Sequence, residues 1–313
     1  MKGSREGWIV FSAVCIVLVI ATLIAFVLRR RVHGAETARA IENLNTRIKA
    51  WWIMVGILSA SLWTGPKAVI LLFAFVSFAA LREFITLTPT RSADHEALFV
   101  GFFFVLPAQY MLVWTEWYGV FTIFIPVYVF LILPTLTVVS SDLGNFLART
   151  SETQWGLMIS TYCISHVPAL LMLRIKGYDP ALLVVYLIIV VQSSDVLQYV
   201  WGKLIGRRKI APLVSPSKTV EGFAGGVATA TLLGTCLWWI TPFKIWQAAA
   251  MSLLITVLGF LGGLVMSAIK RDRGVKDWGN LIDGHGGMLD RIDSVCFAAP
   301  IFFHLTRYFF AET

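Results

Sequence analysis

The chain has 313 residues, of which 58% are hydrophobic and only 14% are charged, against about 25% charged residues in a typical soluble domain. A soluble protein of this length could not bury so much apolar surface, so the composition excludes a soluble globular enzyme and predicts a polytopic membrane protein. The net charge of +8 could suggest nucleic acid, but basic loops held on the cytoplasmic side explain it better, and we expect no nucleic-acid partner.

Ten apolar runs are long or apolar enough to cross a membrane, and they lie at residues 8–28, 50–64, 66–81, 97–114, 117–139, 155–173, 181–201, 222–241, 246–268 and 294–310. They predict an all-α fold with about ten (nine to ten) transmembrane helices, in a single integral membrane domain over residues 1–313. The runs 50–64 and 66–81 are each short of the roughly 20 residues that a span needs. Gly65 and Pro66 between them could mark a turn or a kink.

The distribution of Lys and Arg predicts the orientation. With ten spans and an outside N-terminus, 19 of the 26 basic residues fall in the loops 29–49, 82–96, 140–154, 202–221 and 268–293. Basic residues retain loops on the cytoplasmic side. We therefore predict a multi-pass protein of a bacterial inner (plasma) membrane, with its most polar loops on the cytoplasmic face.

The first polar feature along the chain is Asp195, which follows the apolar run 182–191. An ionisable residue at or inside a membrane boundary is costly and is a functional candidate by default. The alternative is an ordinary polar group at a helix end just outside the bilayer. The functional interpretation is favoured because Gln192, Ser193, Ser194 and Gln198 add further polarity nearby.

The second feature is the segment 215–222, which contains Ser215, Lys218 and Thr219 and precedes an apolar run. Hydroxyls, a lysine and free amides before a helix make a plausible phosphate site. The alternative is a capping segment, in which Ser217 or Thr219 caps the helix and an acidic residue stabilises its first turn. The segment alone does not decide between them.

The third feature is the polar block 267–293 between two apolar runs. Its cations can neutralise phosphates; they include Lys270, Arg271, Arg273 and Lys276. Asp290 and Asp293 are three residues apart, so on a helix both carboxylates would lie on one face and could share a divalent ion. Asp277 is a further candidate ligand for Mg²⁺.

The glycines of residues 284–287 permit a tight turn and a close approach of the backbone to phosphate. The alternative for the whole block is a solvated loop of paired charges, because it contains five basic and five acidic residues. A loop of paired charges alone would not require the Gly-His-Gly-Gly sequence of residues 284–287 or the three-residue spacing of Asp290 and Asp293. The block indicates metal-assisted phosphoryl or nucleotidyl chemistry at a membrane surface.

The block resembles the signature of the CDP-diacylglycerol synthases (phosphatidate cytidylyltransferases). The matching positions are Ser267, Lys270, Arg271, Lys276, Asp277, Gly279, His285, Gly286, Gly287, Asp290, Arg291 and Asp293. Upstream positions that also look like the family's are Asp195, Tyr199, Gly202, Gly206, Ser215, Pro216, Lys218, Thr219, Glu221 and Gly222. The motif-bearing resemblance covers roughly residues 190–300, and the N-terminal half is matched only in being multi-span.

The resemblance implies that CTP and phosphatidate, or a related acidic lipid, react at the membrane to form CDP-diacylglycerol and pyrophosphate in phospholipid biosynthesis. It implies a Mg²⁺ centre, with a second cation and a homodimer left open. Asp290 and Asp293 would hold the metal, with Asp277 and Asp195 as further ligands. The catalytic set would add Lys270, Arg271, Lys276 and His285, and the nucleotide or its phosphates would contact Ser215, Lys218, Thr219, Arg291, Gly286 and Gly287.

The chain departs from the family where an acidic Gly-Asp-x-x-Glu-Ser run usually leads into the block. Gly263 stands for the usual Asp and Met266 for the usual Glu, and Asp283 sits where Pro is usual. Either Asp283 or Asp195 compensates, or this is a divergent branch with altered metal use, altered substrate or weak activity.

Two other functions stay open. One is a CTP-dependent enzyme acting on another membrane lipid, such as a polyprenol kinase-like activity. The other is a lipid or ion transporter without enzymatic activity. A transporter predicts polar groups at the midplane in broken helices, often with inverted repeats, whereas the polar residues here cluster at one face and no repeat is visible.

Overall fold

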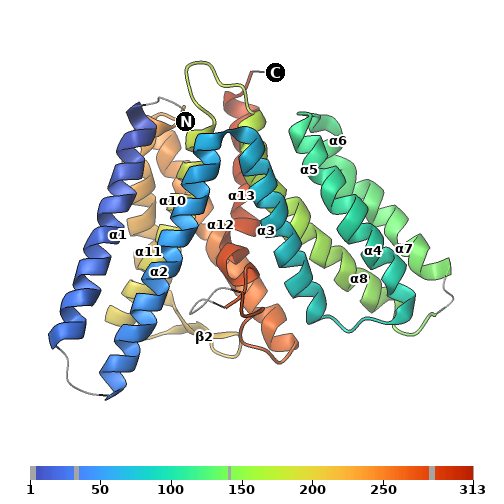
Figure 1. Cartoon of the computed structure of the whole chain (residues 1–313), viewed down its shortest axis with the longest axis horizontal. Coiled ribbons are helices and arrows are strands. Elements are labelled where there is room, and N and C mark those ends of the chain that lie inside the picture. Colours follow the sequence, from blue (N-terminus) through green and yellow to red (C-terminus); the bar gives the residue numbers. More distant parts are fainter. Residues whose placement is uncertain (1–4, 32–34, 140–141, 282–285, 313) are drawn as a thin grey trace.

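The chain folds into a bundle of long helices with a two-stranded sheet at one end (Figure 1). The computed structural model describes residues 5–31, 35–139, 142–281 and 286–312. The helices are α1 (Arg5–Arg31), α2 (Ala35–Thr64), α3 (Pro66–Thr86), α4 (His95–Val100), α5 (Leu106–Trp114), α6 (Tyr118–Ile123), α7 (Phe130–Val139), α8 (Phe146–Leu157), α9 (Ile164–Ala169), α10 (Ala181–Leu204), α11 (Val220–Cys236), α12 (Ile245–Asp272) and α13 (Leu289–Phe310).

Short π-helical and 3-10 turns adjoin several of these α-helices. The π-helical turns are Gly101–Val105, Phe124–Val129 and Met158–Cys163, and the 3-10 turns are Ser92–Asp94, Leu170–Met172 and Trp238–Ile240. Each π-helical turn joins two α-helices into one continuous rod, so the pairs α4–α5, α6–α7 and α8–α9 each act as a single long element.

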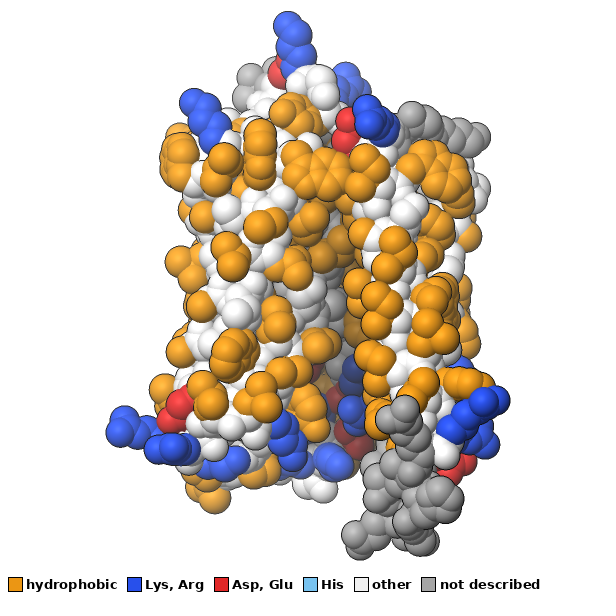
Figure 2. Space-filling model, turned by 90° about the vertical axis from the view of Figure 1, so that its left-hand side faces the viewer, with side chains coloured by type: hydrophobic (Ala, Val, Ile, Leu, Met, Phe, Trp, Pro, Cys, Tyr) orange, Lys and Arg blue, Asp and Glu red, His pale blue; other side chains and the backbone are white. Residues whose placement is uncertain are grey.

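The helices confirm a polytopic all-α membrane protein. Among the described residues, seven helical segments are long and apolar enough to cross a membrane: Arg5–Arg30, Pro66–Thr86, Ser92–Trp114, Tyr118–Val139, Phe146–Met172, Ala181–Leu204 and Ile245–Asp272. Three further long helices, α2, α11 and α13, fall outside this set, so the count of ten spans stays a prediction. Hydrophobic side chains cover the middle of the face in Figure 2, and Lys and Arg gather at both ends.

Gly65 forms a turn between two helices rather than a kink within one. Its φ of 135° is open to glycine and strained for other residues, and Pro66 follows as the first residue of α3, where its missing N–H is harmless. Helices α2 and α3 pack against each other. Both termini lie at the upper end in Figure 1, and the sheet lies at the lower end.

The sheet is a small antiparallel hairpin of β1 (Lys209–Ala211) and β2 (Ser215–Thr219), in which Lys209 lies opposite Thr219. It connects α10 to α11 and adds a short β element to the all-α fold that the sequence predicts. The hairpin ends at the N-terminus of α11, which Thr219 caps by accepting a hydrogen bond from the Gly222 amide at 3.1 Å. This confirms the capping interpretation of that segment.

Glycines allow the last four long helices to approach closely. A Cβ on Gly226 of α11 would lie 2.6 Å from the Gln198 Cα of α10, and one on Gly262 of α12 would lie 2.8 Å from the Asp293 carbonyl oxygen of α13. Small residues at helix contacts permit such backbone approach in membranes. The result is a tight α10–α11–α12–α13 group, in which Met266 is fully buried in the hydrophobic core.

Candidate functional site

The centre of the site is a pair of carboxylates on two neighbouring helices. Ser294 connects them: its hydroxyl donates to Asp195 Oδ1 at 3.1 Å, and its amide donates to Asp293 Oδ1 at 2.8 Å. Both aspartates are half-buried. Asp195 comes from α10, nine residues before its last residue Leu204, and therefore lies about 14 Å from that helix end at 1.5 Å per residue.

Lys218 is the cation next to this carboxylate pair. Strand β2 carries it, and its Nζ lies 3.4 Å from the Phe260 carbonyl oxygen of α12 and 4.7 Å from the centre of the Phe260 ring. Burial lowers the pKa of the Lys218 ammonium, and the charges of Asp293 and Asp195 oppose that shift. The β1–β2 hairpin thus places the positive charge of Lys218 near the negative charges of Asp195 and Asp293.

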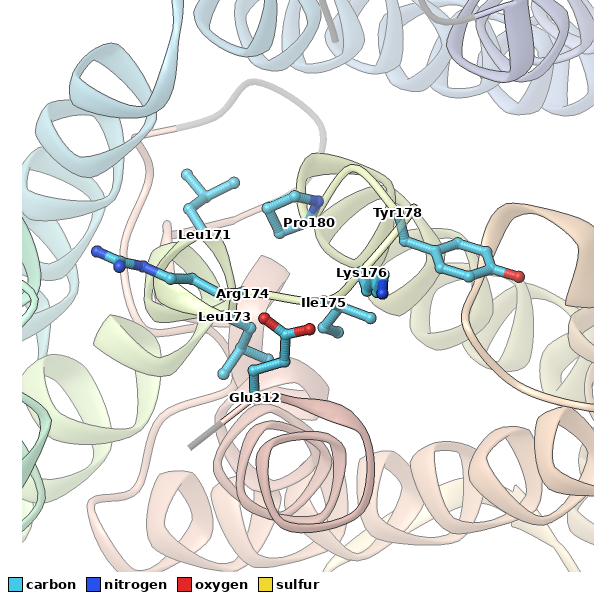
Figure 3. A pocket seen from close by; sticks show the side chains of 8 residues that line it. All are labelled: Leu171, Leu173, Arg174, Ile175, Lys176, Tyr178, Pro180 and Glu312. Atoms are coloured by element: carbon cyan, nitrogen blue, oxygen red, sulfur yellow. The ribbon is translucent and has the colours of Figure 1, made fainter.

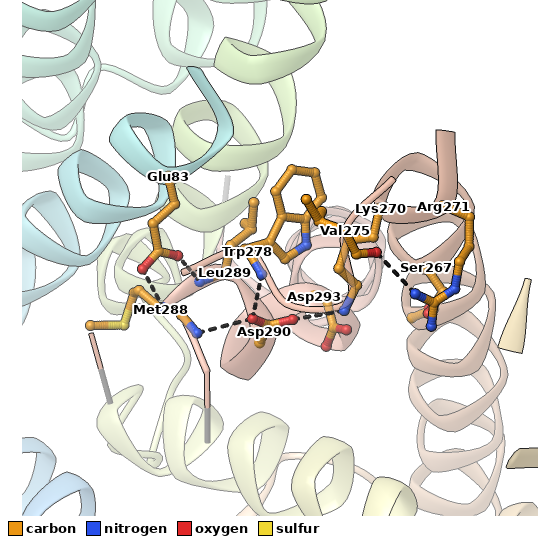
Figure 4. A network of polar contacts seen from close by, with 12 residues as sticks. Glu83, Ser267, Lys270, Arg271, Val275, Trp278, Met288, Leu289, Asp290 and Asp293 are labelled. Carbon is orange, nitrogen blue, oxygen red and sulfur yellow. Dashed lines mark hydrogen bonds and ion pairs between the residues drawn. The ribbon is translucent and has the colours of Figure 1, made fainter. Parts of the chain in front are cut away.

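Asp290, three residues before Asp293 in the first turn of α13, organises the preceding loop. Its Oδ1 forms an ion pair with Lys270 Nζ at 2.7 Å, and its Oδ2 accepts from the amides of Trp278 at 2.8 Å and Gly287 at 2.9 Å (Figure 4). Gly286 has a φ of 82°, which lets the chain turn tightly into the helix. Each oxygen of Asp290 therefore already has a partner within the protein.

Glu83 is a site residue that sequence reasoning missed. It comes from α3, is buried, and accepts from the amides of Met288 and Leu289 at 2.8 Å each (Figure 4). It satisfies free amides at the N-terminus of α13, where a negative charge is also favourable. The signal in the sequence is an Arg82–Glu83 pair inside an otherwise apolar run, but nothing local links it to residue 288.

The structure brings together only some of the predicted site residues. Asp195, Asp293 and Lys218 meet at one point, and Lys270 with Asp290 lies beside them. Arg271, Lys276 and Asp277 are exposed. His285 and Asp283 lie outside the described residues.

Three other predicted residues lie on elements next to the pair, Arg271 on α12, Ser215 on β2 and Arg291 on α13. Arg271 donates to the Val214 and Val275 carbonyl oxygens at 3.3 and 2.9 Å. Ser215 is buried in β2, while Arg291 is half-buried in the first turn of α13, and its Nε has no hydrogen-bond partner. The nucleotide-binding roles of Ser215, Thr219, Arg291, Gly286 and Gly287 stay predictions, as do the catalytic roles of Arg271, Lys276 and His285.

The oxygen donors at the carboxylate pair fit Mg²⁺. Among the described residues, His, Cys, Asp and Glu side chains form no group of three or more that could hold a metal ion, so these residues offer at most two carboxylates at one point. Mg²⁺ typically takes one or two carboxylates and completes its shell with water and substrate phosphates. The geometry favours Asp195 with Asp293 for this role, and the metal roles of all four predicted ligands, Asp195, Asp293, Asp290 and Asp277, stay predictions.

A cavity elsewhere in the protein is not part of this site. It has a volume of about 480 Å³ and is lined by Leu171, Leu173, Arg174, Ile175, Lys176, Tyr178, Pro180 and Glu312 (Figure 3). It lies near the C-terminus, which is at the upper end of the bundle, opposite the sheet (Figure 1). None of the predicted site residues lines it.

Comparison with known proteins gives consistent matches. A sequence profile of the cytidylyltransferase family matches residues 45–309. The chain is 41% identical over 297 residues to the uncharacterized protein YnbB of Escherichia coli (strain K12), covering 93% of this chain and 95% of that protein. It is 35% identical over 213 residues to the phosphatidate cytidylyltransferase of Bacillus subtilis (strain 168), covering 66% and 75%.

A further match is the phosphatidate cytidylyltransferase of Staphylococcus haemolyticus (strain JCSC1435), 32% identical over 157 residues, covering 48% of this chain and 60% of that protein. The family profile begins within α2 and includes almost all of α13. Helix α1 lies outside the matched range, whereas every residue of the carboxylate pair and its surroundings lies inside it.

Proposed function

Because the chain belongs to the cytidylyltransferase family, whose members are nucleotidyltransferases, we propose that it transfers the cytidylyl group of CTP to phosphatidate. The products would be CDP-diacylglycerol and pyrophosphate. The observation that supports this most directly is the Asp195–Asp293 pair with Lys218 beside it. A lysine can neutralise the phosphates of a lipid and a nucleotide, and a carboxylate pair can hold a divalent ion that does the same.

In the proposed reaction a phosphate oxygen of the lipid attacks the α-phosphorus of CTP. A P–O bond forms to the lipid phosphate as the bond to the β-phosphate oxygen breaks, so pyrophosphate leaves with the electron pair. A Mg²⁺ held by Asp195 and Asp293 would neutralise phosphate charge when bound. Lys218 places a further positive charge where negative charge develops, which lowers the barrier without covalent chemistry.

The residues around the pair hold this arrangement in position. Glu83 and Asp290 together fix four backbone amides of residues 278–289. This anchors Gly287 and the first turn of α13, the helix that carries Asp293. A rigid supporting layer is what keeps reacting groups within productive distance.

The lipid would reach the site from the membrane. Figure 2 shows a vertical hollow between two columns of hydrophobic side chains, with acidic and basic side chains gathered at its lower end. Acyl chains fit the apolar part of such a hollow and a phosphate fits its charged end. We place the motif loops on the cytoplasmic face of a bacterial inner membrane, within one membrane domain whose residues 190–300 carry the catalytic motifs.

The test is pyrophosphate release by the purified protein in detergent, with CTP and phosphatidate, in Mg²⁺ and in EDTA. We expect release that requires both substrates and the metal, and its loss in Asp293→Asn. The matched control is Asp272→Asn, the same change at a carboxylate that is 74% exposed at the end of α12, which should retain activity. Release from another lipid acceptor alone would move the assignment to a CTP-dependent enzyme of a different lipid.

A further inference from the structure

The side chain of Lys218 reaches away from its own hairpin and ends against helix α12. Its Nζ lies within reach of the Phe260 carbonyl oxygen and over the Phe260 ring. Burial lowers the pKa of the Lys218 ammonium, the charges of Asp293 and Asp195 oppose that shift, and the charge of Lys270 adds to it. The ammonium is therefore a half-buried cation that lies against α12 near the carboxylate pair.

Gly263 provides the space for this ammonium. A Cβ on Gly263 would lie 2.9 Å from Lys218 Nζ, closer than real Cβ contacts allow, but 3.6 Å from Ser294 Oγ and 3.8 Å from Asp293 Oδ2. Among these three neighbours, only the flexible end of Lys218 would have to move. Gly263 is buried, so its missing side chain leaves a site beside Asp293 that the ammonium enters.

The charges constrain how many metal ions this site can bind. Enzymes that transfer phosphoryl or nucleotidyl groups often use two metal ions about 3.5–4 Å apart, and such a pair needs several shared carboxylates. In the part of the chain that the structure describes, no third His, Cys, Asp or Glu side chain joins Asp195 and Asp293 in a group that could hold a metal ion, and the ammonium groups of Lys218 and Lys270 both lie near Asp293. Two divalent ions there would face a fixed positive charge with too few ligands.

We propose that Gly263 and Lys218 together set the number of metal ions: Lys218 acts as a built-in counter-cation beside the Asp195–Asp293 pair, and the pair binds one divalent ion. The inference rests on the metal assistance in the proposed function. In this proposal the absence of a side chain at Gly263 is functional, because any side chain at that position would displace the Lys218 ammonium.

The experiment counts bound ions without substrates. The metal-free protein in detergent is titrated with Mn²⁺, and free Mn²⁺ is measured by electron paramagnetic resonance. We expect one Mn²⁺ per wild-type chain and two per Gly263→Asp chain, because the new carboxylate adds a ligand beside Asp293 and displaces Lys218. Gly263→Ala is the matched control: it adds the same Cβ without a ligand and should stay at one ion.

Lys218→Met provides a second, independent measurement that does not depend on how α12 tolerates substitution. Removing the ammonium removes its repulsion of the divalent ion, so the Mn²⁺ dissociation constant should fall about tenfold with one ion still bound. A weakened Mn²⁺ affinity in this variant would overturn the proposal. So would a Gly263→Asp chain that still binds a single ion.

The wild-type count separates failure of this inference from failure of the proposed function. Two ions on the wild-type chain would overturn the inference alone and leave a metal-assisted cytidylyltransferase intact. No bound Mn²⁺ would overturn both the inference and the metal part of the proposed function.

Discussion

Two clusters of buried and partly buried charge differ in how completely their charges are paired. In the first, which we call the Arg149 cluster, the Arg149 guanidinium contacts Asp94 at 2.9 Å and the Asp142 carbonyl oxygen at 2.6 Å, and Arg91 pairs with Asp142 at 3.1 Å. Two cations face two carboxylates. In the second, the carboxylate site of Asp195, Asp293 and Lys218, neither aspartate forms an ion pair among the described residues, and the neighbouring Lys270 pairs with Asp290 instead.

The difference teaches that burial of charge alone does not identify a functional site. Arg149 and Asp94 are each only 5% exposed, yet they form an ion pair with each other that holds α8 against the start of α4, although Arg149 Nε has no hydrogen-bond partner. Charges brought together without full compensation are costly, and they persist where a ligand completes them. The carboxylate site has this character and the Arg149 cluster does not.

The largest effect is expected from Asp293→Asn, which separates activity from stability. Turnover should fall at least about 100-fold, because a bound metal ion contributes several kcal/mol to charge stabilisation. Thermal stability in EDTA should stay level or rise, since the change removes repulsion between Asp293 and Asp195. If the variant keeps near-normal turnover, the metal role of Asp293 is contradicted. If the variant unfolds, Asp293 has a structural role like that of Asp94.

The opposite pattern is expected from Asp94→Asn. Breaking a buried ion pair by removing one charge typically costs 3–5 kcal/mol, and because Arg149 keeps its contacts to Asp142 we expect about 3 kcal/mol here. Melting of the purified protein in detergent measures this loss. Turnover at a temperature where the variant is folded should stay near normal. A selective loss of turnover without a loss of stability would contradict the distinction between the two clusters.

Glu83→Gln should have an intermediate effect, because Glu83 supports the carboxylate site without belonging to it. One acceptor for the amides of Met288 and Leu289 is lost, which should reduce stability by about 1–2 kcal/mol. The shifted start of α13 should lower kcat about tenfold, as for other residues that orient metal ligands. The matched control is Glu116→Gln, a 51% exposed partner of Arg174, which should leave kcat unchanged.

The smallest effect is expected from Asp142→Asn. The Gly144 amide, followed by Arg91, holds the pKa of the Asp142 carboxyl below its usual range. A lowered folded-state pKa contributes stability above the carboxyl's ordinary pKa, and that stability is lost as the pH falls through the folded-state value. The variant should therefore melt slightly below wild type at neutral pH, and the gap should close in strong acid. A gap that widens in acid would contradict this sign.

Much of the architecture could be predicted from local patterns. Apolar runs predicted the helices, whereas Asp290 and Asp293, which the sequence placed in the loop 268–293, belong to helix α13. The Thr219 cap followed from a hydroxyl before a helix. The predicted loop 268–293 was longer than the true one, because α12 continues to Asp272 and α13 begins at Leu289. In the sequence, charged residues at the ends of a helix resemble a loop, although in the structure the helix continues through them.

The sequence by itself determined that this is a membrane protein, where its helices lie, and which residues carry its family's motifs, because each of these depends on neighbours along the chain. Only the tertiary structure decided which charges meet. Ser294 reaches Asp195 across 99 residues and Glu83 reaches Met288 across 205. Such contacts depend on how closely whole helices pack. Glycines such as Gly262 permit this close packing, but no local sequence pattern encodes which helices meet.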